Sequence, residues 1–174
     1  AKGRIVGANK DDFHLKNVDL ARYAKIADAD YADLVVVKDG EQTLTKDQDY
    51  TVSYSNHVNS GDNTAVATVT GIGNYSGEKK LNFTINKAPL TVKANDHSIG
   101  HGDAAGNNGV TYTGFVNGET ASELDGTLSY AYKTASDGSG TSYTTASPVG
   151  TYYIIPGGLT SNNYAITFEA GTLS

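Results

Sequence analysis

The chain has 174 residues, a net charge of −6 and no Cys, Met or Trp. This length fits one large domain or two small ones, and the lack of cysteine excludes disulfides, zinc–thiolate sites and cysteine nucleophiles. The acidic balance argues against binding to nucleic acid or to anionic lipid, because both require a basic face.

The sequence also lacks the patterns of membrane and targeting segments. No apolar run approaches the ~18 residues that cross a bilayer, so we expect no membrane insertion. The first residues do not combine a basic stretch with an apolar one, so we expect no signal peptide. Since no Met stands even at position 1, we expect the chain to be a piece of a longer precursor.

In the first half, alternation of apolar and polar residues predicts strands with one buried and one wet face. These strands are predicted over residues 34–37, 50–55, 65–70 and 80–85. Their spacing of about ten residues fits a β-sandwich. Earlier, residues 11–33 indicate an entering strand with Phe13 and Leu15, followed by an irregular or short helical connection.

A step in composition predicts a boundary between two modules, residues 1–87 and residues 88–174. The first part carries 11 Lys and Arg against 12 Asp and Glu, a net of −1. The second carries 2 against 7, a net of −5, together with 13 of the 20 glycines. Pro89 favours an extended residue before it, so we expect a joint of only a few residues.

The second half also reads as strands, interrupted by one short helix. Strands are predicted over residues 90–94, 110–115, 128–133, 151–155 and 164–168, and residues 134–145 form an expected exposed loop. Thr120 and Glu123 have the spacing of a capping box, and Gly126 can end a helix after one or two turns. This order fits a β-grasp-like module, and it fits a second sandwich equally well. The whole chain is therefore predicted to be mainly β, as two small β modules in tandem.

A series of short motifs in the first half has a familiar pattern. They lie at residues 49–56, 68–71, 73–77 and 83–85. Together they resemble an Ig-like repeat common in bacterial surface proteins, over residues 34–86.

The second half resembles the MBG domain of bacterial extracellular adhesins, over nearly its whole length. The matching pieces, in the order of the family, are residues 88–92, 115–122, 147–152, 162–166 and 171–173. One position differs, because the family usually shows Tyr-Gly-Asp where this chain has His101, Gly102 and Asp103.

These resemblances imply a non-catalytic, extracellular repeat of a bacterial cell-surface adhesin, on a wall-attached parent. The implied role is that of a semi-rigid stalk or adhesion module, with neighbouring repeats of the parent chain as partners and the chain itself a monomer. Two alternatives are a module that binds host glycans, mucin or extracellular matrix, and an accessory module of a secreted carbohydrate-active enzyme.

Tyrosines form the most suggestive candidate ligand-binding pattern. They are Tyr130 and Tyr132 on one predicted strand and Tyr152 and Tyr153 on another. Exposed aromatic rings with polar rims hold sugars and partner surfaces. The alternative is that these rings build the core of a module that has no Trp and little Phe.

Asp28, Asp30 and Asp33 are spaced so that their oxygens could bind Ca²⁺. The alternative is a solvated acidic loop, since the glycine turn and distal Glu of an EF-hand are missing. His97 and His101, together with Asp96 and Asp103, are a second metal candidate, but the glycines around His101 favour a polar loop. No other cofactor is expected, because nucleophile-elbow, P-loop and His-Glu-x-x-His patterns are absent.

The resemblance to wall-anchored adhesin modules also raises a covalent possibility. Such modules sometimes carry a Lys–Asn isopeptide bond between strands. Lys93 lies on an early predicted strand and Asn162 precedes the last one, so this pair is the candidate. The alternative is that Lys93 lies on the wet face of its strand.

Overall fold

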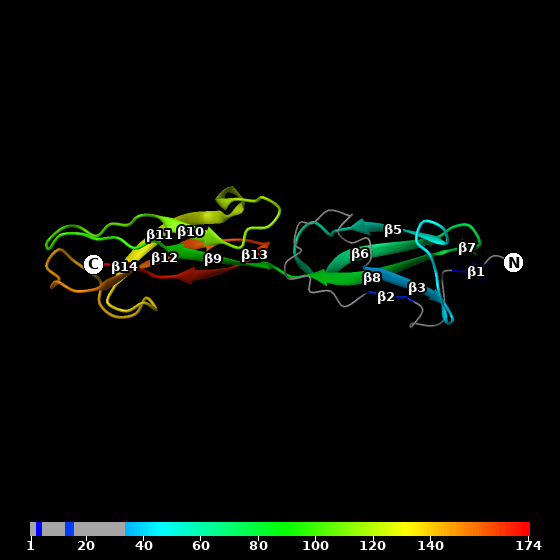
Figure 1. The fold of residues 1–174 in the computed structure, drawn as a ribbon, viewed down its shortest axis with the longest axis horizontal. Helices are drawn as coiled ribbons and strands as arrows, with labels where there is room; N and C mark the ends of the chain where they lie inside the picture. The colour runs from blue at the N-terminus through cyan, green and yellow to red at the C-terminus, as the bar shows by residue number, and fades with distance from the viewer. Residues whose placement is uncertain (1–2, 5–12, 16–33) are drawn as a thin grey trace. The chain divides into compact units, whose positions relative to one another are not determined.

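The computed structural model describes residues 3–4, 13–15 and 34–174 (Figure 1). The chain divides into two compact units, Ala1–Lys87 and Ala88–Ser174. Strands dominate the described residues, which confirms a mainly β fold. In this part of the chain, no helix has the length and apolar character needed to cross a membrane.

The described strands of the first unit form three sheets. They are β1 (Gly3–Arg4), β2 (Phe13–Leu15), β3 (Val35–Asp39), β4 (Gln42–Thr43), β5 (Tyr50–Ser55), β6 (Gly61–Gly71), β7 (Tyr75–Ser76) and β8 (Glu78–Ile85). Strands β5, β6 and β8 form one antiparallel sheet in that order, and β2, β3 and β4 form another. Strands β1 and β7 make a short parallel pair.

The core of the first unit lies where side chains of both antiparallel sheets meet. On β6, Ala65, Ala67 and Val69 are buried in alternation with half-buried residues, as a two-residue period requires. We call the whole group the sandwich core, and its buried members are Leu34, Val35, Val37, Leu44, Tyr50, Ala65, Ala67, Val69, Phe83 and Ile85. Two sheets that share one core are the arrangement of a β-sandwich.

The four strands expected in this unit are present; β6 and β8 are longer than predicted, and β3 begins and ends later. Strand β6 begins at Gly61, inside a stretch of turn-forming residues that the sequence does not mark as strand. The entering strand predicted at Phe13 and Leu15 is present as β2, which pairs with β3. The connection predicted after it, over residues 16–33, lies outside the described residues.

The second unit contains six strands and one helical turn. They are β9 (Ala88–Ala94), β10 (Val110–Thr113), the 3₁₀ turn η4 (Ala121–Glu123), β11 (Asp125–Lys133), β12 (Tyr152–Thr160), β13 (Tyr164–Glu169) and β14 (Gly171–Leu173). One sheet has the order β10, β9, β13, and the other has the order β11, β12, β14. Because only Ala170 separates β13 from β14, the last stretch of chain passes from one sheet to the other.

The first strand of this unit, β9, and its second-to-last strand, β13, run side by side in parallel (Figure 1). Their register pairs Ala88 with Tyr164 at one end and Lys93 with Glu169 at the other. Strand β9 therefore lies between β10 and β13 in its sheet and is parallel to β13, while β11, β12 and β14 form a second sheet.

Two groups of apolar side chains fill the second unit. The Leu90 cluster has Ala88, Leu90, Val92 and Tyr164 as its buried members. The Ile154 cluster has Ala94, Tyr152, Ile154 and Leu173. Both clusters contain residues of β9, because its even-numbered side chains all point inward.

The predicted helix is shorter than its sequence pattern suggests. Thr120 caps η4, and its hydroxyl accepts from the backbone N–H of Ser122. The turn ends after Glu123 because Leu124 is already extended and packs on the Leu90 cluster. Gly126 does not end a helix; it lies in β11 with φ of 82°, beside a register shift against β12.

Candidate functional site

Three of the four candidate tyrosines pack against the core of the second unit. Tyr152 is buried within the Ile154 cluster, and Tyr130 and Tyr132 are half-buried against it. The Tyr132 hydroxyl accepts a hydrogen bond from the side-chain amide of Asn107 at 3.0 Å. Desolvation raises the pKa of Tyr130 above its ordinary value of 10, with smaller contributions from nearby tyrosines. These rings therefore serve as structural side chains.

Tyr153 lies on the opposite face of β12, since neighbouring residues of a strand point to opposite sides. It is half-buried and pairs in register with Lys133 and Thr172. The structure thus separates Tyr153 from the other three tyrosines, and the four rings do not form one surface.

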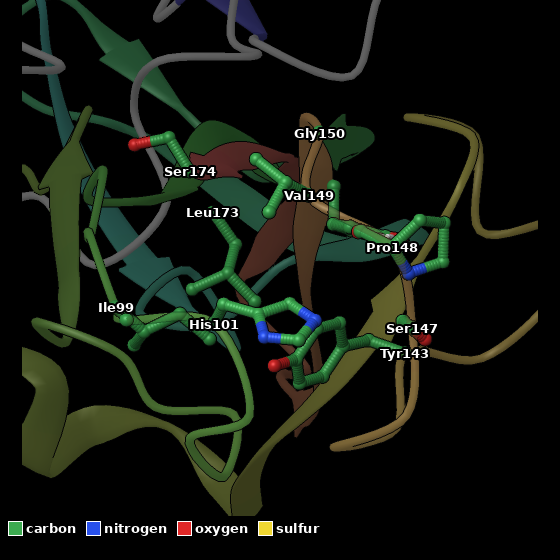
Figure 2. Close-up of a pocket in the computed structure, with 11 residues that line it drawn as sticks. Ile99, His101, Tyr143, Ser147, Pro148, Val149, Gly150, Leu173 and Ser174 are labelled. Carbon is green, nitrogen blue, oxygen red and sulfur yellow. Dashed lines mark hydrogen bonds between the residues drawn. The ribbon is translucent and has the colours of Figure 1, made fainter.

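One hollow of the second unit lies among three segments that are far apart in the sequence (Figure 2). They are residues 99–101, residues 143–150 and the last two residues, Leu173 and Ser174. The hollow is small, with a cavity volume of about 50 Å³. Apolar side chains with a few hydroxyl groups and the His101 imidazole line it, which is the usual make-up of a small binding site.

Tyrosine hydroxyls hold the loop on one side of this hollow. The hydroxyl of Tyr152 donates to the backbone oxygen of Pro148 at 2.8 Å. The hydroxyl of Tyr143 donates to the backbone oxygen of Asp103 at 2.7 Å. The two rings meet edge to face, with centroids 5.0 Å apart. The loop is therefore fixed at both of its borders, and its tip is presented to solvent in a defined position.

Val149 at the tip of this loop is 85% exposed, the largest exposure among the large hydrophobic residues in the described part of the chain. Single exposed apolar residues are common on soluble proteins. Here the residue stands beside a hollow and on a fixed loop, so it is the feature of this unit best placed to meet a partner. The sequence reasoning missed it, although a valine between Pro148 and Gly150 is a signal of an apolar residue in a turn.

The second metal candidate is built from groups that already have backbone partners. The Asp96 carboxylate accepts from the N–H of Thr172 at 2.8 Å, and the Asp103 carboxylate accepts from the N–H of Gly100 at 2.9 Å. The backbone of His97 pairs with Thr172 as part of the strand ladder. Among the residues that the structure describes, no three metal-binding side chains come together.

The two remaining candidates are the calcium site and the isopeptide pair. The calcium candidates Asp28, Asp30 and Asp33 lie outside the described residues. Lys93 is exposed and pairs with Glu169, whereas Asn162 lies just before the opposite end of β13. Five residues of strand, a length of roughly 17 Å, separate the Lys93–Glu169 pair from the end of β13 that Asn162 precedes. The structure therefore does not bring Lys93 and Asn162 together.

Comparison with protein families assigns the second unit. Residues 90–174 match the family model described as "MBG domain (YGX type)". The second unit is therefore similar to MBG domains, and residues 88–174 are called the MBG domain below after this match. No curated protein and no solved structure matches the chain. MBG domains are non-catalytic, repeat-type domains, and the match supports a surface repeat module of bacterial proteins.

The hollow beside Val149 lies entirely within the MBG domain. His101, which lines it, stands where the resemblance described above leads us to expect a tyrosine. The replacement exchanges a large aromatic ring for a smaller imidazole at the mouth of the hollow.

Proposed function

We propose that the chain is a non-catalytic extracellular repeat of a bacterial cell-surface adhesin and acts as a semi-rigid stalk. The observation that carries this proposal is the parallel pairing of β9 with β13. Because β13 and the residues that follow it to Ser174 run beside residues 88–99 in the same direction, the chain enters the MBG domain at one end and leaves it at the other. A repeat with this connection adds its own length to a string of modules.

The length that one MBG domain adds to such a string follows from the strand geometry. From Tyr164 to Ser174 the chain runs beside residues 88–99, so a module advances the chain by roughly 30 Å or more. An antiparallel first and last strand would return the chain to its starting end and add little length. The connection therefore suits a spacer that holds an adhesive region away from the cell wall.

Surface display in a bacterial host tests the stalk function. One, two or four copies of the chain are placed between a wall anchor and a small binding tip of known specificity. We expect capture of tip-specific beads to rise with the number of copies, and cells that lack the tip to capture none. If capture does not depend on the number of copies, the stalk function is wrong.

A second candidate function is binding of host glycans, mucin or matrix protein, and the hollow beside Val149 favours it. The probe is purified mucin immobilised on a sensor surface, with immobilised matrix protein in parallel. The variant Val149→Ser removes the exposed apolar tip, and Val58→Ser in the first unit removes a 50% exposed valine as the matched control. Binding that Val149→Ser abolishes and Val58→Ser preserves would favour this second function.

A further inference from the structure

The parallel contact between the two ends of the MBG domain continues beyond the β9 and β13 strands. The His97 N–H donates to the oxygen of Thr172 at 2.9 Å, and the Ser174 N–H donates to the oxygen of His97 at 3.0 Å. The Ile99 N–H donates to the oxygen of Ser174 at 2.8 Å. Nearly the whole first segment of the domain thus lies bonded beside nearly the whole last segment.

This arrangement determines how tension acts on the domain. The starting residue Ala88 and the final residue Ser174 lie at opposite ends of two adjacent parallel segments. A pull between them is directed along the strands, so it tries to slide one segment past the other. Sliding breaks the hydrogen bonds of the ladder together, whereas peeling from one end would break them one after another.

We propose that this ladder, formed by residues 88–99 against residues 164–174, is a mechanical clamp that keeps the MBG domain folded under tension between its ends. The inference rests on the proposed stalk function for its biological purpose. Its physical content, a direction-dependent resistance to force, is independent of that function.

Side-chain burial strengthens the clamp. Leu90, Val92 and Ala94 on β9 have exposures of 1%, 0% and 0%, so one face of the ladder is sealed from water. A backbone hydrogen bond that water cannot reach has no replacement partner while it breaks. Sliding of β9 also has to expose these apolar side chains at the same moment.

Two side-chain contacts fasten the far end of the ladder. The Asp96 carboxylate accepts from the Thr172 N–H, and the hydroxyls of Ser98 and Ser174 lie 2.9 Å apart. Both contacts join residues 76 positions apart in the chain. Each therefore ties the first segment directly to the last one.

Asp137 provides a matched control for Asp96. Its carboxylate accepts from the Ser139 N–H, also at 2.8 Å, but this bond stays within the loop between β11 and β12. The pKa of each of these two aspartates is lowered by its hydrogen bonds. The two carboxylates make the same kind of bond, and only that of Asp96 joins the two segments of the clamp.

Single-molecule force spectroscopy on the full chain tests the clamp. The sequence contains no cysteine, so engineered cysteines give unique attachment points. The sliding geometry uses Lys87→Cys with a cysteine appended after Ser174, and the peeling geometry uses Lys87→Cys with Asn162→Cys. We expect a rupture force at least about twofold higher in the sliding geometry, because its hydrogen bonds break together rather than singly.

The aspartate variants give a second readout in the sliding geometry. Asp96→Ala is expected to lower the rupture force by about one tenth, since it removes one of roughly ten bonds across the clamp. Asp96→Asn keeps an acceptor oxygen and restores most of the force, and Asp137→Ala leaves the force unchanged. Thermal unfolding of each variant verifies that it is folded before it is pulled.

Equal rupture forces in the sliding and peeling geometries would overturn the clamp. So would equal losses in Asp96→Ala and Asp137→Ala. Neither outcome bears on the bead-capture experiment, which measures reach at the cell surface. Failure of the clamp and failure of the stalk function are therefore distinguishable.

Discussion

In the first unit, ten buried apolar residues of the described segments form one continuous core, whereas in the second unit the buried residues fall into two groups of four. The MBG domain adds to its smaller clusters a set of tyrosine hydroxyls that bond to loops. Besides Tyr143 and Tyr152, Tyr164 accepts from the N–H of Val116 and hydrogen-bonds the Glu119 carboxylate. A sheet protein can thus replace some apolar burial by hydrogen bonds that tie its loops to its strands.

The largest expected effect comes from a cavity in the sandwich core. Phe83 is 5% exposed and meets the ring of Tyr54 edge to face. Phe83→Ala is expected to cost the first unit about 3–5 kcal/mol of its free energy of unfolding. In scanning calorimetry the transition of the first unit should fall while that of the MBG domain stays in place. A common shift of both transitions would show that the two units unfold as one.

The next effect concerns Gly158 of β12, which lies very close to the backbone of β11. Gly158 has φ of 87°, and an added Cβ would lie 2.1 Å from the backbone oxygen of Thr127. Gly158→Ala is expected to cost about 2–4 kcal/mol through left-handed strain and crowding. Urea unfolding measures this cost. Gly157→Ala is the control, because no atom lies within 4 Å of its added Cβ; an equal cost there would contradict the explanation.

A smaller effect is expected at the tyrosine that holds the 143–150 loop. Tyr152→Phe keeps the ring and removes only the bond to the oxygen of Pro148, so it should cost about 1 kcal/mol. Limited proteolysis should then cut near Val149 faster than in the unaltered chain. The same substitution at Tyr153, on the other face of β12, should leave the cutting rate unchanged.

The smallest effect is a pH dependence at the far end of the clamp. Hydrogen bonds from Thr172 lower the pKa of Asp96 below its ordinary value of 3.8. The resulting stabilisation is fully present above pH 3.8 and is lost as the pH falls through the lower pKa of the folded state. The difference in melting temperature between the unaltered chain and Asp96→Ala should therefore shrink as the pH drops below 3.8. A difference that stays constant down to the acid limit of folding would contradict this linkage.

Strands with one buried face could be predicted well from the sequence. Residues 50–55 alternate because Val52 and Tyr54 contact the sandwich core while the serines between them face water. The same period puts Tyr152 and Tyr153 on opposite faces of β12, although both were predicted as members of one ligand-binding pattern. Strand β14 was missed because a three-residue strand is too short to show a period.

Other features depend on partners far away in the sequence. The parallel pairing of β9 with β13 joins residues 76 positions apart, and no local pattern specifies it. Gly126 looks like a helix stop, but its place is decided by the close approach of the Gly158 backbone. The tyrosines were the main ambiguity, because a Tyr on a strand has the same pattern whether its face meets solvent or a core.

The placement of the tyrosines also changes the choice of binding experiment. A Tyr130→Ala, Tyr132→Ala double substitution would remove two rings that support the Ile154 cluster, so lost binding would be confounded with lost structure. Substitution at the exposed Val149 avoids this problem.

The position of β13 near the end of the MBG domain has a consequence for the order of folding. Strand β9 is the first part of this domain to be synthesised, yet its partner on one side is among the last. The contact closes a loop of about 75 residues, and long closures of this kind slow folding. The domain therefore stays incomplete until its final residues have emerged, and it remains an open chain for as long as it is being made or threaded through a pore.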